Sequence, residues 1–314
     1  MNVTVVSNML LLGAPALNEI DPFRLCAAGM AGAFILIGLR QVWETTLRAP
    51  LLWSLLACFL LAYAEGNLTT SGEETLQRIP TYRYFYYVSI FCPLMAVLGA
   101  KRPQNRGWQW IVLSLWVTLT IPAIQSLLDD PTARLVLPGM WKGFLWLLIM
   151  MGLLNYLPTR HWLAALPFAI GQVFLFWEYI FPVRPSSLEL LGGEKLISWG
   201  YYLMAGAVGI VWLQSLTKRS VNLEKGQHVE RLVPQLGRWL RFRDGWGAFW
   251  TARLMARVNQ TAELQKWPIR LWPSGFKAVD ESADVEITEE LAASVEKTLD
   301  ALLWRFERVD ERDG

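Results

Sequence analysis

The sequence predicts a mainly α-helical, polytopic membrane protein: a seven-transmembrane-helix bundle with a small α+β C-terminal cytoplasmic module. Seven apolar stretches of near membrane-spanning length fill residues 23–217. The chain is also 54% hydrophobic over 314 residues, which is too apolar for an ordinary soluble domain. The residues after 217 are polar and rich in Trp and Arg, which predicts a separate part outside the bilayer.

Each apolar stretch is expected to form one membrane-crossing helix. The hydrocarbon core is about 30 Å thick and a helix rises about 1.5 Å per residue, so a crossing needs about 20 apolar residues. Lipid offers no hydrogen-bond partners, so the backbone must satisfy its own polar groups as a helix. The expected spans cover about 23–39, 50–64, 84–100, 108–127, 135–157, 161–181 and 196–217.

The distribution of Lys and Arg over the loops predicts the orientation. One set of loops comprises 40–50, 101–107 and 158–160, and the other comprises 1–24, 65–83, 128–134 and 182–195. The first set carries six Lys or Arg in 21 positions, and the second carries six in 64. Because cytoplasmic loops are enriched in basic residues, we expect the first set and the tail inside and the N-terminus outside. The membrane is expected to be a plasma or inner membrane.

The N-terminal segment 1–22 is expected to lie outside the membrane without being cleaved. It has no Lys or Arg before Arg24, whereas a signal peptide begins with a positive region. Farther on, Tyr84, Phe85, Tyr86 and Tyr87 crowd the outer end of the third span. Aromatic rings settle at the headgroup level, so this cluster predicts an interfacial anchor.

Two charged residues inside the predicted spans are the candidates for a ligand pocket. Lys142 lies below the outer edge of the fifth span, and Glu178 lies below the outer edge of the sixth. An intramembrane charge costs about 2.5–3.5 kcal/mol on insertion scales and indicates a functional site by default. We expect either an outward-facing polar pocket that also involves Tyr179 and Arg184, or snorkelling of both side chains to the headgroups.

The tail is strongly polarised in charge. Residues 218–277 carry 12 Lys or Arg and four Asp or Glu, whereas residues 278–314 carry four and twelve. Either the acidic part folds onto the basic part, or the basic part faces anionic lipid while the acidic part faces the cytosol. The sequence leaves both alternatives open.

The segment 218–243 is expected to be a basic amphipathic stretch that follows the last span directly. Such segments usually lie in the inner membrane interface, where each basic residue near anionic headgroups contributes about 1 kcal/mol. The residues expected to contact the membrane surface are Arg231, Arg238, Trp239, Arg241 and Arg243.

Residues 244–314 predict a small cytoplasmic module. A helical run extends to about Gln265, and two short extended pieces then surround a Pro273-Ser274-Gly275 turn. Thr288 is a suitable N-cap for a final acidic amphipathic helix. The run Arg243-Asp244-Gly245-Trp246-Gly247 looks like a motif, and no mechanism follows from it.

Several functional classes find no support in the residues. The two histidines, His161 and His228, do not form a candidate haem pair, and the cysteines lack CxxC spacing for a metal. The last span contains no Lys for a retinal Schiff base. Nucleotide-binding and hydrolase motifs are also missing, so we expect no cofactor and no metal, and the residues assign no catalytic side chain. Nucleic-acid binding is not expected next to a bilayer.

The sequence favours a non-catalytic membrane subunit or scaffold. Its expected partners are the lipid bilayer, including anionic headgroups on the cytoplasmic side, and a cytoplasmic or membrane protein bound by the C-terminal module. The alternative is a transporter-like or lipid-processing protein that uses the pocket around Lys142 and Glu178. The alternative requires the charged pair, whereas the scaffold requires the module.

Overall fold

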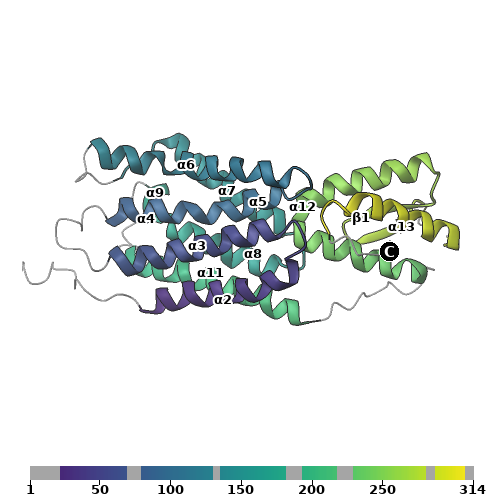
Figure 1. The fold of residues 1–314 in the computed structure, drawn as a ribbon, viewed down its shortest axis with the longest axis horizontal. Helices are drawn as coiled ribbons and strands as arrows, with labels where there is room; N and C mark the ends of the chain where they lie inside the picture. Colours follow the sequence, from purple (N-terminus) through teal and green to yellow (C-terminus); the bar gives the residue numbers. More distant parts are fainter. Residues whose placement is uncertain are drawn as a thin grey trace, which may run out of the picture.

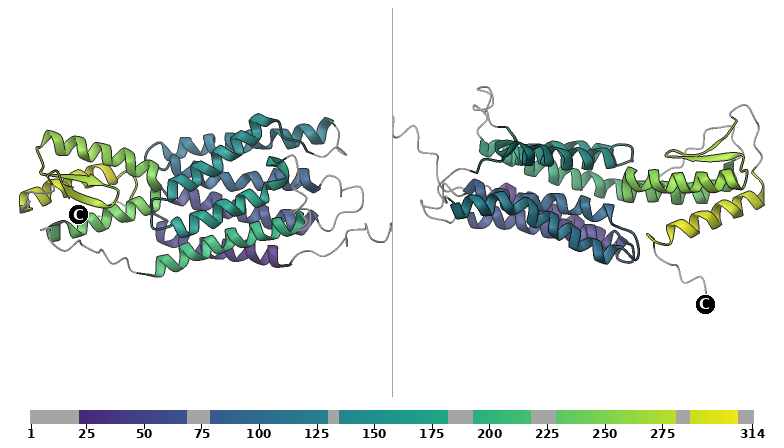
Figure 2. Two further views of the ribbon diagram at one scale, coloured as in Figure 1. Left: turned by 180° about the vertical axis from the view of Figure 1, so that it is seen from behind. Right: turned by 90° about the horizontal axis from the view of Figure 1, so that it is seen from above.

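The protein is an elongated helical bundle with a C-terminal unit attached to one end (Figure 1). This computed structural model describes residues 22–68, 79–129, 135–181, 193–217, 229–280 and 287–307. The bundle helices run roughly along the long axis of the molecule. The C-terminal unit (residues 229–307) continues along the same axis, as the two further views also show (Figure 2).

Every stretch predicted to cross the membrane is helical, and two of the stretches are broken. The helices of the bundle are α2 (Pro22–Val42), α3 (Arg48–Leu68), α4 (Ile79–Tyr87), the 3-10 helix η2 (Val88–Phe91), α5 (Cys92–Leu98), α6 (Asn105–Asp129), α7 (Gly139–Tyr156), α8 (Trp162–Leu175), α9 (Trp177–Ile180) and α11 (Gly193–Leu216). The break before α5 coincides with Pro93, which lacks a backbone N–H and stands in the first turn of that helix. The break between α8 and α9 lies at Phe176.

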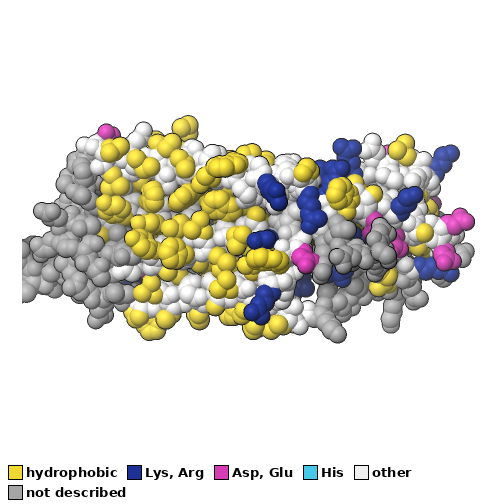
Figure 3. All heavy atoms as spheres, in the orientation of Figure 1, with side chains coloured by type: hydrophobic (Ala, Val, Ile, Leu, Met, Phe, Trp, Pro, Cys, Tyr) yellow, Lys and Arg dark blue, Asp and Glu magenta, His cyan; other side chains and the backbone are white. Residues whose placement is uncertain are grey.

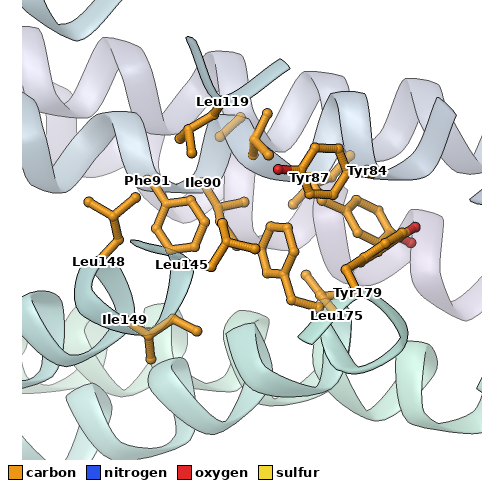
Figure 4. Close-up of a cluster of buried hydrophobic side chains, with 14 of the residues drawn as sticks. Tyr84, Tyr87, Ile90, Phe91, Leu119, Leu145, Leu148, Ile149, Leu175 and Tyr179 are labelled. Carbon is orange, nitrogen blue, oxygen red and sulfur yellow. The ribbon is translucent and has the colours of Figure 1, made fainter. Parts of the chain in front are cut away.

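The bundle has one main hydrophobic core among the described residues. Tyr84, Tyr87 and Phe91 from the third stretch are completely buried there, against side chains from α6, α7, α8 and α9. In the close-up, the labelled tyrosines lie at one end of the core and Leu148 and Ile149 lie at the other (Figure 4). The prediction that Tyr84 and Tyr87 are interfacial anchors is therefore wrong, because neither ring reaches the surface.

Helices α8 and α11 pack with almost no space between their backbones. A Cβ atom placed on Gly171 would lie 2.9 Å from the carbonyl oxygen of Gly200, and one on Gly200 would lie 3.0 Å from that of Gly171. Small residues of this kind allow close helix packing where lipid supplies no hydrophobic driving force.

Four described helices are long and apolar enough to cross a membrane: Pro22–Val42, Arg48–Gly66, Asn105–Asp129 and Gly193–Leu216. The bundle also exposes many large apolar side chains, such as Phe59, Trp110 and Leu147, which are 62%, 73% and 60% exposed. Hydrophobic side chains cover the visible face of the bundle, whereas Lys and Arg gather toward the end that carries the C-terminal unit (Figure 3). This distribution indicates a membrane protein.

The C-terminal unit has the mixed composition that the sequence predicts. It comprises η3 (Val229–Leu232), α12 (Val233–Leu264), the strands β1 (Ile269–Trp272) and β2 (Gly275–Ala278), and α13 (Glu289–Leu303). The strands form an antiparallel hairpin around the predicted turn, with Trp272 opposite Gly275. The Thr288 hydroxyl accepts a hydrogen bond from the Leu291 N–H at 3.2 Å, which confirms the predicted N-cap.

The outer edge of β1 is closed by one side chain. The Asn259 amide accepts a hydrogen bond from the Leu271 N–H at 2.7 Å and donates one to the Leu271 carbonyl at 2.9 Å. A single amide thus satisfies both backbone groups that Leu271 would otherwise present to a neighbouring strand.

The acidic helix α13 folds onto the basic start of α12, so the first of the two alternatives for the polarised tail is confirmed. Arg238 forms ion pairs with Asp300 and with Glu307, the latter at 2.7 Å. Gln235 also donates to Glu296 at 3.3 Å. Partial burial lowers the pKa of Arg238, but hydrogen bonds to Asp300 and Glu307 outweigh it and raise the pKa above the ordinary arginine value.

Helix α12 bends sharply at Gly247, and this bend rests on the bundle (Figure 1). Gly247 has φ 79° and ψ −177°, a conformation that is essentially restricted to glycine. A Cβ atom there would lie 2.2 Å from Nδ2 of Asn155, a fully buried residue near the end of α7. The Asn155 side chain accepts a hydrogen bond from the Phe249 N–H at 3.1 Å. The backbone of the bend therefore packs directly against α7.

Side chains of α12 continue this contact into three loops of the bundle and the last turn of α5. The Trp246 indole donates to the Thr46 hydroxyl at 3.2 Å, and that hydroxyl donates to the Ala100 carbonyl at 2.8 Å. The Trp250 indole donates to the Val97 carbonyl at 3.0 Å. A carboxylate oxygen of Asp244 accepts the N–H of Arg160 at 3.2 Å.

The chain after α13 completes this contact region, which we call the joint. The Phe306 carbonyl accepts the Thr46 N–H at 3.1 Å, and the Phe306 ring packs edge-on against Trp250 with centroids 4.9 Å apart. The joint comprises Thr46, Val97, Ala100, Asn155 and Arg160 of the bundle and Asp244, Trp246, Gly247, Trp250 and Phe306 of the C-terminal unit. The motif-like run that ends at Gly247 thus forms part of the joint, together with Trp250 and Phe306.

Candidate functional site: a buried arginine–glutamate network

Four charged side chains from four helices meet at the bundle end opposite the joint. They are Arg24 of α2, Glu65 of α3, Arg83 of α4 and Glu194 of α11, and we call them the arginine–glutamate network. The side chains of Arg24, Glu65 and Arg83 are 5%, 3% and 10% exposed. The Glu194 side chain is 66% exposed, so it is the network's accessible member.

Glu65 lies at the buried centre of the network. One of its carboxylate oxygens pairs with Arg24 at 3.0 Å and with Arg83 at 3.5 Å. The other oxygen accepts the hydroxyl groups of Tyr87 at 3.0 Å and Tyr201 at 3.3 Å. A buried carboxylate is stable only when it is paired and hydrogen-bonded, and Glu65 meets both conditions.

Glu194 bridges the two arginines from the surface side. Arg83 binds its carboxylate with both terminal nitrogens, at 2.5 Å and 3.1 Å, which is the two-pronged geometry favoured between arginine and carboxylate. Arg24 reaches the same carboxylate at 2.9 Å, donates to the Glu194 backbone carbonyl, and donates through Nε to Ser198 at 2.9 Å.

The helix ends explain why these charges need one another. Arg24 lies in the first turns of α2, and Glu65 lies near the end of α3. A cation near a helix N-terminus and an anion near a C-terminus both oppose the helix dipole. Pairing them across α2 and α3 offsets this unfavourable interaction, whereas Glu194 in the first turn of α11 has the favoured sign.

Two buried polar atoms beside the network have no hydrogen-bond partner in the described structure: Nε of Arg83 and the hydroxyl of Tyr84. Arg83 is 8% exposed and Tyr84 is fully buried. Since buried polar groups are usually satisfied, each such atom indicates a missing partner or a functional role.

An apolar cavity of about 100 Å³ begins next to the network. The ring of Tyr201 lines the cavity, while the hydroxyl of Tyr201 binds Glu65. The remaining lining is mostly small or aliphatic and includes Ala27, Ala31, Ala57 and Met204. The bundle therefore places a fixed ionic group at one end of an apolar chamber.

The predicted pocket residues lie near this end, but the structure does not join them into one site. Lys142 is half-buried in the first turn of α7, Glu178 is half-buried in α9, and no ion pair links the two. The buried Tyr179 donates to the Pro80 carbonyl at 2.6 Å, which connects α9 to α4. Arg184 lies outside the described residues. The role of these residues stays a prediction.

The structure corrects the predicted membrane-surface set at two positions. Trp239 is completely buried and donates to the Trp272 carbonyl at 3.0 Å. Arg243 is 8% exposed, and its guanidinium binds Asp244 and the Pro273 carbonyl. Both side chains belong to the interior of the C-terminal unit because α12 packs against the hairpin and α13.

The other three members of that set lie at the surface of the C-terminal unit. Arg231 donates to the Ile287 carbonyl at 2.8 Å, and Arg238 forms the ion pairs with α13 described above. Arg241 is exposed. Contact of these three with lipid stays a prediction.

Sequence reasoning missed the network because it assigned Arg24, Arg83 and Glu194 to loops and read Glu65 as the end of a span. A signal was present. Glu65 ends an apolar run, and Arg83 stands within a run of aromatic residues that is continuous with the third span. Opposite charges just inside the ends of neighbouring spans are candidates for pairing.

The described part of the chain contains no group of three His, Cys, Asp or Glu side chains that could hold a metal ion. No known protein family, no curated protein and no solved structure matches the chain.

Proposed function

We propose that the protein is a seven-pass membrane protein with its N-terminus outside and its C-terminal unit in the cytoplasm. The joint supports one side of this topology, because the basic loops that contain Arg48, Arg102 and Arg160 lie at the end that carries the C-terminal unit. The four long helices account for four passes. The pieces α4–η2–α5, the helix α7 and the pair α8–α9 would supply the other three.

A fusion experiment tests this topology. A reporter that is active only in the cytoplasm is joined after Gly314, and activity is expected in intact cells. A second reporter of the same kind, inserted within 182–192, is expected to be inactive. Activity at the second position, or inactivity at the first, would contradict the proposed orientation.

Within this topology, we infer that the protein is a non-catalytic scaffold that presents its C-terminal unit to a cytoplasmic or membrane protein. The joint carries this proposal. Backbone and indole hydrogen bonds tie two loops and α7 to both sides of the bend at Gly247, so the unit is held in one orientation to the membrane. A fixed orientation is useful for positioning a partner and unnecessary for a loosely tethered tail.

The surface of the C-terminal unit supports a protein partner. Leu264, Val279 and Trp272 are 79%, 57% and 52% exposed, although this unit lies beyond the apolar part of the bundle. Exposed aromatic residues, above all Trp, are enriched at sites of protein association. Trp272 stands at the hairpin turn, at the surface of the unit.

The scaffold proposal can be tested in the native host by photocrosslinking. A photoreactive amino acid replaces Trp272 in the full chain, and a discrete protein adduct is expected. The same amino acid at Trp110, which is 73% exposed on the bundle, should label lipid. Gly247→Ala should weaken the Trp272 adduct several-fold, whereas Gly237→Ala in the same helix should leave it unchanged. The absence of a protein adduct from positions 264, 272 and 279 would overturn the proposal.

The alternative, a transporter-like or lipid-processing protein with a pocket at Lys142 and Glu178, draws on one observation. Both residues are half-buried, and their helices α7 and α9 are in contact. The double change Lys142→Met with Glu178→Leu separates the two proposals. In the double variant, the Trp272 adduct should form in either case, so cellular function is the discriminating measurement. A scaffold keeps its cellular function, whereas a protein that uses the pocket loses it.

A further inference from the structure

We propose that the arginine–glutamate network and the adjoining cavity form a binding site for a single-chain amphiphile with an anionic head. The head would be a carboxylate or a phosphate monoester, and the apolar chain would occupy the cavity. This inference goes beyond the scaffold role and does not depend on the C-terminal unit.

Glu194 supplies a counter-charge to the buried arginines from the surface side. Arg24, Arg83 and Glu65 are all nearly buried, and together they carry one net positive charge. A buried net charge is costly unless a counter-charge lies close to it. The position for that counter-charge is now occupied by the Glu194 carboxylate. Both terminal nitrogens of Arg83 bind this carboxylate, and Arg24 binds it at 2.9 Å.

Glu194 fills this position as an exchangeable occupant. Its side chain is 66% exposed, whereas the arginines that it binds are 5% and 10% exposed. Replacing the Glu194 carboxylate by a carboxylate head leaves the charge of the site unchanged, and a phosphate monoester head makes it more negative. Glu194 then returns to water, where a carboxylate is well solvated, so the exchange exposes no buried charge.

The unsatisfied nitrogen of Arg83 favours a ligand whose acceptor atoms can reach this donor, which Glu194 leaves unused. Nε of Arg83 has no acceptor in the described structure, even though the residue is more than nine-tenths buried. A guanidinium binds carboxylate and phosphate groups through several parallel N–H donors. A free ligand head can move toward Nε, whereas Glu194 is attached to the first turn of α11.

The cavity supplies the matching apolar part of the site. It holds about 100 Å³ and is lined mainly by carbon atoms, and Tyr201 contacts both parts of the site, because its side chain lines the cavity and its hydroxyl binds Glu65. Apolar cavities of this kind stay dry and accept apolar ligands. Ser54 and Val208, which line the cavity, are also partly exposed at the surface of the bundle. A chain could therefore come from the surrounding lipid.

The test uses the full chain in nanodiscs of phosphatidylcholine and a dodecanoate that carries a diazirine on its chain. Wild-type protein is expected to be labelled on peptides from α3 and α11, which line the cavity. Unlabelled dodecanoate or dodecyl phosphate should compete, and their relative strength identifies the preferred head. Dodecanol, acetate and inorganic phosphate should compete at least tenfold less well, since each lacks one half of the ligand.

Variants of Glu194 make the proposal falsifiable even where other variants do not fold. Glu194→Ala empties the counter-anion position and should tighten dodecanoate binding about tenfold. Glu263→Ala, which removes an exposed carboxylate paired with Arg270, should leave binding unchanged. Arg83→Gln should abolish labelling. Unchanged or weaker binding in Glu194→Ala, or equal competition by dodecanol, would overturn the proposal and leave the network a structural latch.

Discussion

The two ends of the bundle are held together by different physical means. At one end, two arginines and two glutamates join α2, α3, α4 and α11 through ion pairs that are mostly buried. At the other end, the joint connects the bundle to the C-terminal unit through indole and backbone hydrogen bonds around the bend at Gly247. The first contact depends on charge balance, and the second depends on backbone shape.

This difference determines how each end can fail. Removing one charge from the network leaves its partners buried and uncompensated, so the cost falls on the whole bundle. Changing the shape of the joint strains one point of the backbone, so the C-terminal unit should loosen while the bundle stays folded. The variants below break one end at a time, beginning with the largest expected effect.

Glu65→Leu should destabilise the bundle by about 3–5 kcal/mol, because Arg24 and Arg83 lose their buried counter-charge. Thermal unfolding of the purified protein, followed by tryptophan fluorescence, measures the change. Asp129→Leu, which changes an exposed carboxylate at the end of α6, is the matched control and should stay within about 0.5 kcal/mol of wild type. An equal effect of the two substitutions would show that burial in the network carries no special weight.

Gly247→Ala should cost about 1–3 kcal/mol at the joint, since alanine is strained at this backbone conformation. The new Cβ atom would also collide with Asn155 at 2.2 Å. Limited proteolysis should release the C-terminal unit faster and leave the bundle intact. Gly237→Ala lies in the same helix with no atom within 4 Å of its new Cβ atom, and it should not accelerate cleavage. Equal cleavage of both variants would refute the role of Gly247.

Arg238→Gln should have the smallest effect, up to about 1 kcal/mol, because its ion pairs with α13 are partly exposed. The raised pKa of Arg238 adds stability that is present below the ordinary arginine pKa and is lost only as pH rises above it. Arg238 should therefore stay charged at neutral pH. Because its ion pairs are partly exposed, their contribution to stability should fall as the salt concentration rises. The difference in free energy of unfolding between wild type and Arg238→Gln should be smaller at high salt than at low salt. A difference that does not change with salt would contradict a stabilising role for these ion pairs.

The sequence predicts the helical elements well because each depends on local composition. The hairpin turn at Pro273-Ser274-Gly275 and the cap at Thr288 follow from turn and capping preferences, and both are confirmed. The prediction for Trp239 and Arg243 was wrong for a related reason. An amphipathic basic segment looks the same whether its apolar face meets lipid or a neighbouring helix, and α13 supplies that neighbour.

The network was beyond sequence reasoning because its members are far apart in the chain. Arg24 and Glu194 are separated by 170 residues, and only the packing of α2 beside α11 brings them together. The joint shows the same limit. The run that ends at Gly247 was visible as a pattern, but its partner Asn155 lies in a separate helix with no sequence feature to connect them.

The amide of Asn259 has a consequence for molecules that share one membrane. Proteins confined to a surface meet in a fixed orientation and at high local concentration, and C-terminal units at one height would bring their hairpins side by side. A bare strand edge would then pair with its neighbour and grow into a chain of units. By holding both backbone groups of Leu271, Asn259 makes the β1 edge a poorer template at this position, which disfavours pairing of neighbouring units along that edge.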